Sequence, residues 1–215
     1  MEKGSPVVMM RSRTREAAGV VPPDADSRLL ERCRQGDADA FETLFRKYHT
    51  YVYNVSLGML GNSEDAADVT QEAFLRIHRS LPHFRGEASF STWLYRVAVN
   101  LCISELRRRS RGRLQYLDDL ALPEEETDLD HGPTPQEAVE AEEQRRTVQQ
   151  ILHALPPDYR AIMVLRHFQQ LAYEEIAEVL QLSLSQVKTR LFRARKMFKD
   201  RYKAFLGDEG ALLTD

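Results

Sequence analysis

The chain has 215 residues, enough for one large domain or two small ones, and its 42% hydrophobic and 29% charged residues are ordinary for a globular protein. No stretch approaches the roughly 20 apolar residues that span a bilayer, and the N-terminus has no apolar core with a cleavage site, so we expect no signal peptide and a cytoplasmic location. Cys33 and Cys102 lie far apart without metal-ligand spacing, which favours buried free thiols.

The formal net charge of −3 conceals a segregation of charge along the chain. Residues 115–143 include many acidic residues but no lysine or arginine, so the rest of the chain is net basic. Basic residues concentrate at 96–113 and at 184–203. Because local patches rather than the overall charge attract a polyanion, the net acidity does not exclude nucleic-acid binding.

The N-terminal half contains a tail and then helical patterns. Residues 1–25 mix Gly, Pro, Ser and Arg without periodicity, and we predict a disordered tail there. From residue 27 apolar residues recur at helical spacing, interrupted at Gly36, Gly61 and Pro82. The predicted inward positions of the first two helices are Leu29, Leu30, Cys33, Phe41, Leu44, Phe45, Tyr48, Val52 and Val55.

The third predicted helix, residues 64–80, has two faces of different character. Its inward stripe consists of Ala66, Val69, Ala73 and Ile77. Charged residues share the opposite face, and Gln71 and Phe74 also lie off the inward stripe; the charged set is Asp65, Asp68, Glu72, Arg76 and Arg79. If this face were only solvated, ion pairs at i, i+4 would contribute about 0.2–0.5 kcal/mol each. Because Gln71 and Phe74 also lie off the inward stripe, we interpret the face as a surface that binds a partner.

The remaining elements complete an all-α fold of two small helical domains joined by an acidic flexible linker. In the fourth helix Phe90, Trp93, Leu94, Val97 and Leu101 keep the helical period, and the helix continues into Arg107, Arg108 and Arg109. Further helices place Val148, Ile151, Leu152, Leu155, Ile162 and Leu165 inward. The predicted boundaries are a tail at 1–25, domains at 26–110 and 137–206, the linker at 111–136 and a tail at 207–215.

Residues 173–199 have the pattern of a helix-turn-helix. Ile176, Ala177 and Leu180 face inward on its first helix, and Val187, Leu191 and Ala194 do so on its second. Ser183 and Gln186 fit a capping box that begins the second helix. Its outward side chains suit contacts with DNA, Arg190 and Arg193 with guanine edges and Lys188 and Lys196 with phosphates. The full outward set is Ser185, Gln186, Lys188, Thr189, Arg190, Phe192, Arg193 and Lys196.

Motifs in this order resemble those of bacterial RNA polymerase sigma factors of the sigma-70 family. They are Gly36-Asp37 with Ala40-Phe41, the runs 65–74 and 84–100, Leu155-Pro156-Pro157, and the runs 173–177 and 187–195. The resemblance spans 27–109 and 138–205, which would be sigma regions 2 and 4. Because no further domain lies between these two regions, the resemblance is to the small extracytoplasmic-function (ECF) group. It implies a non-enzymatic, dissociable polymerase subunit that recognises the −35 and −10 promoter elements and promotes strand opening.

The resemblance also implies a role for each group of candidate residues. Asp65, Asp68, Gln71, Glu72 and Phe74 would dock on the polymerase clamp helices. The −10 element would be opened by Phe84, Arg85, Trp93, Tyr95, Arg96 and Asn100, with Arg107 and Arg108 on backbone phosphates. Trp93 shares the apolar stripe of Phe90 and Leu94, so a core role competes with base contact at that position. The helix-turn-helix at 173–199 would read the −35 element.

The implied partners are core RNA polymerase, through its clamp and flap regions, promoter DNA and an anti-sigma factor. We expect a monomer when the chain is free, no cofactor and no metal. The acidic linker would thread toward the polymerase active-site cleft, although a solvated spacer fits its composition equally well. Two positions depart from the family pattern: Ala172 replaces a common capping Ser or Thr, at a cost of about 1 kcal/mol, and Gln181 replaces a frequent turn glycine.

Two other classes of protein fit less well. A stand-alone repressor or activator would be a stable dimer that binds DNA without polymerase, and basic segments in both domains disfavour it. A helical carboxylate enzyme would need Glu-x-x-His pairs, and none of the six histidines has a glutamate three residues before it. The chain also has no phosphate-binding glycine loop and no nucleophile elbow.

Overall fold

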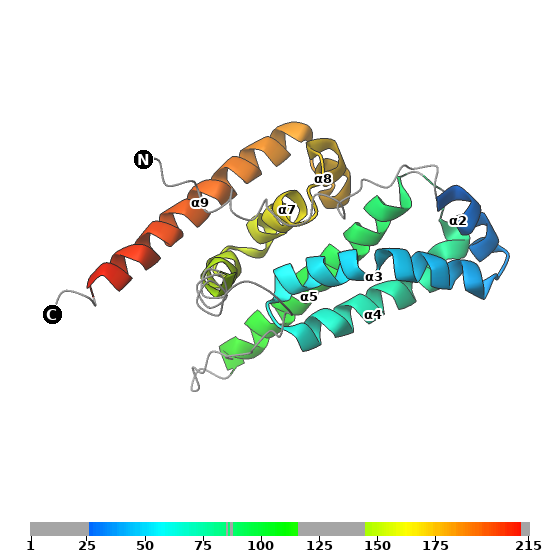
Figure 1. The fold of residues 1–215 in the computed structure, drawn as a ribbon, viewed down its shortest axis with the longest axis horizontal. Coiled ribbons are helices and arrows are strands. Elements are labelled where there is room, and N and C mark those ends of the chain that lie inside the picture. Colours follow the sequence, from blue (N-terminus) through cyan, green and yellow to red (C-terminus); the bar gives the residue numbers. More distant parts are fainter. Residues whose placement is uncertain (1–25, 85, 87, 116–144, 212–215) are drawn as a thin grey trace, which may run out of the picture.

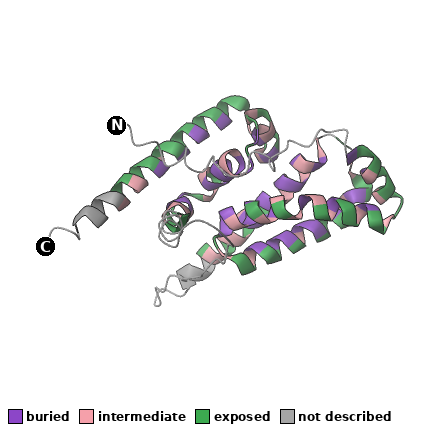
Figure 2. Ribbon diagram, viewed as in Figure 1, coloured by how far each residue is buried: buried purple, intermediate pink, exposed green. Residues whose placement is uncertain are grey.

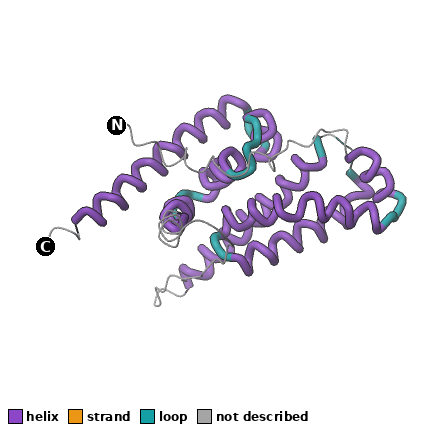
Figure 3. The backbone as a smooth tube through the Cα atoms, in the orientation of Figure 1, coloured by secondary structure: helices purple, strands orange, loops and turns teal. Residues whose placement is uncertain are grey.

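A computed structural model describes residues 26–84, 86, 88–115 and 145–211, with only the backbone described at 111–115 and 206–211. Within these ranges every regular element is a helix, which confirms the predicted all-α fold (Figure 3). The predicted tail at 1–25, most of the acidic linker, and Arg85 lie outside the described residues.

The N-terminal half consists of four α-helices and a short 3-10 turn (Figure 1). They are α2 (Ser27–Arg34), α3 (Ala38–Leu60), α4 (Ser63–Ser80), η2 (Leu81–His83) and α5 (Phe90–Gln115). Helices α3, α4 and α5 pack against one another, and their mutually facing sides are largely buried (Figure 2). α5 continues past residue 111, where the sequence predicted the linker to begin.

Side chains that accept hydrogen bonds from free backbone N–H groups determine where these helices begin. Asp37 caps α3 through the Ala40 N–H at 3.1 Å, and Asn62 caps α4 through the Asp65 N–H at 2.7 Å. Gly61, between the two helices, has φ +90°, a left-handed conformation in which glycine has no steric penalty. The short, capped connection places α3 and α4 side by side.

The C-terminal half contains a helix at residues 145–153, then α7 (Pro157–His167), α8 (Tyr173–Leu180) and α9 (Leu184–Ala211). Helices α7, α8 and α9 pack together, and α9 is the long helix that runs from α8 along α7 (Figure 1). α9 extends beyond residue 206, the predicted end of the second domain. One face of α9 is buried through Val187, Leu191, Ala194 and Phe198.

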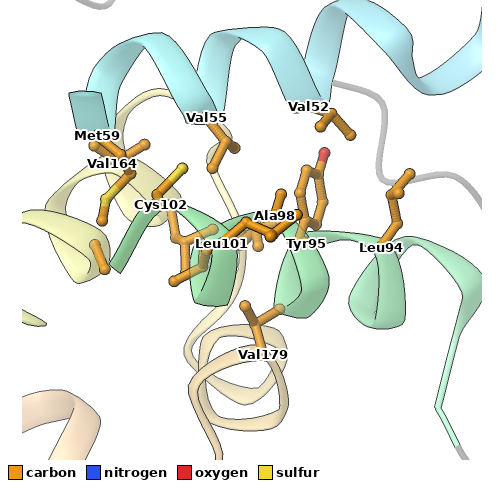
Figure 4. Close-up of a cluster of buried hydrophobic side chains, with 14 of the residues drawn as sticks. Val52, Val55, Met59, Leu94, Tyr95, Ala98, Leu101, Cys102, Val164 and Val179 are labelled. Carbon is orange, nitrogen blue, oxygen red and sulfur yellow. The ribbon is translucent and has the colours of Figure 1, made fainter. Parts of the chain in front are cut away.

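The two halves also pack against each other, so the buried core is continuous between them. Figure 4 shows Val164 of α7 and Val179 of α8 beside side chains of α3 and α5, among them Val55, Met59 and Tyr95. The predicted picture of two small domains on a tether gave no reason to expect this contact. It decides which predicted site residues are accessible.

The two cysteines are free thiols, as predicted. Cys102 is buried, and burial raises the pKa of its thiol to about 12. Cys33 is half-buried rather than buried. A thiol with so high a pKa stays protonated and unreactive, so Cys102 acts as a small apolar side chain of the core.

Candidate nucleic-acid interface

Helices α8 and α9 form the predicted helix-turn-helix, and reciprocal capping fixes the start of α9. The Gln186 N–H donates to Ser183 Oγ at 3.2 Å, and the Ser183 N–H donates to Gln186 Oε1 at 2.8 Å. This pair is the predicted capping box. In helix-turn-helix proteins the first turns of the second helix enter the major groove. The cap therefore fixes which side chains stand at that end of α9.

The two departures from the family pattern leave the motif intact. Gln181 adopts φ 54° and ψ 49°, the left-handed conformation that a turn glycine would take, at a cost of about 1–2 kcal/mol. Ala172 has no side-chain acceptor to cap α8, but its own N–H donates to the Glu175 carboxylate at 2.7 Å. The Ala172 N–H at the start of α8 therefore has a hydrogen-bond acceptor, although Ala172 itself offers no side-chain acceptor to the helix.

The outward face of α9 is accessible almost throughout. The exposed side chains are Ser185, Gln186, Lys188, Thr189, Phe192, Arg193 and Lys196, while Val187, Leu191 and Ala194 are buried as predicted. Phe192 stands out because 70% of its surface is exposed, amid these polar and basic side chains. Arg190 is half-buried, and its guanidinium lies 4.0 Å from the Asp158 carboxylate of α7.

The segment between α4 and α5 supports a pair of stacked aromatic rings. Phe84 and Trp93 lie 4.6 Å apart between ring centroids, with 15° between their planes. Ser89 caps the start of α5 by accepting from the Thr92 N–H at 3.1 Å, and Arg34 of α2 donates to the Phe84 carbonyl at 2.5 Å. Both rings remain half-exposed. The arrangement provides a planar apolar surface at the edge of the N-terminal domain.

Along α5 the predicted DNA contacts have different surroundings. Phe90 and Leu94 are buried, as the apolar stripe predicted, whereas Trp93 is only half-buried. Asn100, Arg107 and Arg108 are exposed, with Arg108 paired to Glu105 at 2.8 Å. The two side chains in the middle of this set, Tyr95 and Arg96, are covered by the C-terminal domain.

Tyr95 and Arg96 do not lie on an open surface in this structure. Tyr95 is only 6% exposed, and its hydroxyl donates to Gln169 Oε1 at 3.4 Å. Arg96 is half-buried and donates to the Glu178 carbonyl of α8 at 2.7 Å. Helical periodicity could not show this, because the covering residues belong to the other domain and lie about 80 positions away.

Most of the residues predicted to dock on polymerase lie on an accessible face of α4, but Phe74 does not. Asp68 and Gln71 are exposed. Glu72 is half-buried, and its carboxylate lies 2.7 Å from Arg76 Nε. Phe74 is 3% exposed and packs edge-on against Phe45 of α3, so the prediction that it lies off the inward face is wrong. The inward stripe of α4 is wider than four residues because α3 and α5 both pack on it.

Asp65 of the same face already has partners within the chain. Its carboxylate pairs with Arg109 of α5 and accepts from the Asn62 side chain. Asp65 therefore ties the start of α4 to the far part of α5. Arg109 also pairs with Glu105 at 2.9 Å, and hydrogen bonds from Arg108 and Arg109 lower the pKa of that carboxyl group.

One exposed apolar residue lies beside the predicted docking residues and was not among them. Leu75 is 43% exposed and lies one turn beyond Gln71 and two beyond Asp68 on α4. A signal was available, because a leucine outside the inward stripe and next to these polar residues is a pattern typical of partner surfaces. For Gln169 and Glu178, which cover Tyr95 and Arg96, no local signal existed.

The described residues hold no group of three or more His, Cys, Asp or Glu side chains that could bind a metal ion. Among them, no helix is both long and apolar enough to cross a membrane. In the part of the chain that the structure describes, the protein consists of a helix-turn-helix and a second helical domain that carries aromatic and basic side chains.

Comparison with known proteins identifies the family. "Sigma-70 region 2" matches residues 44–112, and "Sigma-70, region 4" matches residues 145–198. The chain is 37% identical over 177 residues to the RNA polymerase sigma-H factor of Pseudomonas aeruginosa, covering 80% of this chain and 91% of that protein. It is 35% identical over 186 residues to the ECF RNA polymerase sigma-E factor of Haemophilus influenzae, covering 84% and 97%. The chain belongs to the sigma-70 family, as an ECF sigma factor of transcription initiation, and is thus a non-enzymatic polymerase subunit.

A solved structure has the same fold. The sigma factor RpoE of Bartonella quintana, determined in complex with the anti-sigma factor NepR, superposes with a TM-score of 0.61 at 16% identity. The match covers 76% of this chain and 96% of that one.

Proposed function

We propose that this ECF sigma factor brings core RNA polymerase to its promoters through three separate surfaces. The docking face of α4 binds the polymerase clamp, the aromatic edge at Phe84 and Trp93 captures the −10 element, and α9 reads the −35 element. The observation that carries the proposal is the outward face of α9, where basic and polar side chains surround an aromatic ring that is 70% exposed.

The proposed reading of the −35 element divides the work between side chains. Phosphate contacts position a recognition helix and base-edge contacts give it specificity. Lys188 and Lys196 are assigned to phosphates, and Arg193 to a guanine edge in the major groove. Phe192 is assigned an apolar contact with the methyl group of a thymine base in the major groove. Ser185, Gln186, Thr189 and Arg190 complete the surface.

Strand opening at the −10 element is assigned to the aromatic edge of the N-terminal domain. Flipping a base costs a few kcal/mol, and stacking on an aromatic side chain returns about 1–3 kcal/mol per base. The small difference between the two explains how opening proceeds with polymerase contacts and without nucleotide hydrolysis. Phe84 and Trp93 supply the rings, and Asn100, Arg107 and Arg108 hold the backbone of the displaced strand. Arg85, Tyr95 and Arg96 are the remaining members of the set.

Docking on the clamp is assigned to Asp68, Gln71, Glu72 and Leu75. Leu75 provides the apolar centre and the polar side chains form its rim, as in other protein interfaces. Leu75→Ala is expected to weaken binding to core polymerase about tenfold while changing the free energy of unfolding by less than about 0.5 kcal/mol. Phe74→Ala, one residue earlier, is the matched contrast, because it is expected to destabilise the domain by about 3–5 kcal/mol.

The remaining proposals concern partners and location. A sigma factor with this fold is known in complex with an anti-sigma factor, and we extend such regulation to this chain. We also assign a flap contact to the C-terminal domain, a monomeric free state and a cytoplasmic location. The acidic linker, residues 111–136, would thread toward the polymerase active-site cleft.

Promoter-specific run-off transcription tests the whole proposal. The purified chain is mixed with core polymerase and a library of genomic fragments, and transcripts are mapped. We expect discrete start sites that share two upstream elements, and none with core polymerase alone. Absence of binding to core polymerase would overturn the proposal. A stable dimer that binds the same DNA without polymerase would favour a stand-alone regulator instead.

A further inference from the structure

The aromatic edge of the N-terminal domain is the outer end of a series of rings that begins in the core. Tyr48 is 2% exposed and packs edge-on against Phe90, with 5.3 Å between the ring centroids. Phe90 in turn lies edge-on to both Phe84 and Trp93, at 6.4 and 6.0 Å. These distances lie within the range of about 4.5–7 Å that aromatic pairs prefer. Phe90 therefore links the stacked pair to the buried part of the domain.

The backbones that carry the two stacked rings differ in their support. Trp93 lies in the first turn of α5, and its N–H donates to the Ser89 carbonyl at 3.0 Å. Phe84 follows the turn η2, and its N–H donates to the Leu81 carbonyl at 3.1 Å. The described residues between η2 and α5 belong to no helix. The position of the Phe84 ring therefore depends on what holds the chain where this turn ends.

Arg34, the last residue of α2, holds the chain at this point. Its Nη2 donates to the Phe84 carbonyl at 2.5 Å. A hydrogen bond from an ionised donor is shorter and stronger than one between neutral groups. The Arg34 Nη1 lies 3.2 Å from the Glu31 carboxylate one turn earlier, which orients the guanidinium. The N–H and the carbonyl of Phe84 are thus both bonded, the first within η2 and the second to α2.

Helix α2 is itself anchored on α3 at both ends. At its start Asp26 is 4% exposed, and its carboxylate accepts hydrogen bonds from the Tyr48 hydroxyl and the Lys47 ammonium group. At its other end Arg32 donates to the Asp37 carboxylate at 2.8 Å. The last turn of α2 therefore has a fixed position on the domain, and a side chain that extends from it is held accordingly.

Fixing an aromatic ring before DNA arrives favours capture of a base. A side chain that becomes ordered only on binding loses conformational freedom at that step, which lowers affinity. A ring that is already held in place has lost this freedom during folding. Because Arg34 bonds to the backbone of Phe84, its effect on a captured base is transmitted through the Phe84 ring.

We propose that Arg34 is a positioning residue for capture of the −10 element. Its bond to the Phe84 carbonyl keeps the Phe84 ring stacked on Trp93, where the pair accepts a flipped base. No motif of the sequence indicated this position, because the two partners are 50 residues apart. The inference rests on the proposed function of Phe84 and Trp93. It extends that function to α2, a helix to which no role in promoter recognition has been assigned above.

Trp93 is the single tryptophan of the chain, so its fluorescence reports directly on the stack. Acrylamide quenching is measured on the full chain. Arg34→Ala is expected to raise quenching toward the value for Phe84→Ala, which removes the covering ring, with the helical circular dichroism unchanged. Arg28→Ala is the matched control, because Arg28 is an exposed arginine of the same helix, and it should leave quenching at the wild-type value. Equal quenching of Arg34→Ala and the wild type would overturn the proposal.

A double-mutant cycle in the polymerase holoenzyme tests whether Arg34 acts through Phe84. The probe is a fork-junction DNA whose single strand carries the −10 sequence of a promoter mapped by run-off transcription. Arg34→Ala is expected to weaken binding of this probe about two- to tenfold, which corresponds to ordering one side chain on binding. Arg28→Ala should leave binding unchanged. In the Phe84→Ala background, Arg34→Ala should cause no further loss.

The salt dependence of the same binding separates positioning from direct contact with DNA. Loss of one phosphate contact makes the slope of log affinity against log salt shallower by about 0.7 on a single strand, whereas loss of positioning leaves the slope unchanged. A shallower slope for Arg34→Ala, or an equal loss with and without the Phe84 ring, would overturn the proposal. If Phe84→Ala alone bound the probe as the wild type does, the proposed function of the aromatic edge would be wrong, and the positioning role with it.

Discussion

Among the described residues, α5 and α9 are the two long helices rich in basic side chains, yet their predicted DNA-facing side chains differ in accessibility. On α9 all but one of these side chains are exposed, whereas on α5 Tyr95 is buried and Arg96 is bound to α8. α9 packs on α7 and α8, while α5 packs on α3 and α4 and also on α7 and α8 of the other domain. Periodicity predicts an exposed face only where no distant segment covers it.

The largest expected effects distinguish the buried aromatic residue of α5 from the exposed one of α9. Tyr95→Ala removes a side chain from the core between the domains and is expected to lower the free energy of unfolding by about 3–4 kcal/mol. Phe192→Ala is expected to change it by less than about 0.5 kcal/mol. Urea unfolding measures both. Equal destabilisation by the two variants would contradict the difference in burial.

Removal of a base contact from α9 should affect binding rather than stability. Arg193→Ala is expected to weaken recognition of the −35 element by about 1–3 kcal/mol and to relax specificity at one base pair. The matched control is Lys196→Ala, whose expected loss is similar on all sequences and comes with a shallower salt dependence. Competition binding by the polymerase holoenzyme to variant promoters measures both. A uniform loss for Arg193→Ala would make it a phosphate contact.

The stability of the fold should fall at acid pH. Burial, with the nearby Arg160 cation, lowers the pKa of His153 from 6.5 to about 4, so the folded chain binds fewer protons than the unfolded chain between these values. The contribution of His153 to the free energy of unfolding is fully present above pH 6.5 and is lost as the pH falls toward 4, by up to about 1.4 kcal/mol per pH unit.

Urea unfolding at a series of pH values measures this pH dependence. His153→Gln is the control, because it keeps a hydrogen-bonding side chain that does not titrate in this range. A steeper response in the wild type than in the control is expected. Identical pH profiles would show that other groups determine the response.

The smallest expected effect concerns the turn before α9. Gln181→Gly relieves the left-handed conformation of that residue and is expected to raise the free energy of unfolding by about 0.5–1 kcal/mol. Gln170, with φ 55°, is a matched position outside the helix-turn-helix, and Gln170→Gly should give a gain of the same sign. Thermal unfolding monitored by circular dichroism is the measurement. A loss of stability at both positions would contradict the left-handed assignment.

Local sequence determined the helices, their caps and the recognition surface. The capping box of Ser183 and Gln186, the cap at Asn62 and the buried stripe of α9 all follow from residues within a few positions of one another, because helix periodicity and end groups act over short range. The order of these motifs was sufficient to indicate the family.

Only the tertiary structure determined which side chains of one helix are buried by helices distant in the sequence. Phe74 is buried because α3 brings Phe45 against it, and Tyr95 is buried because the second domain packs on α5. Gly58 of α3 packs against Val164 of α7, and Arg160 of α7 donates to the Met59 carbonyl of α3. These contacts join residues about 100 positions apart, on either side of the acidic stretch. No local pattern encodes such a contact, because each residue in it also satisfies the requirements of its own helix.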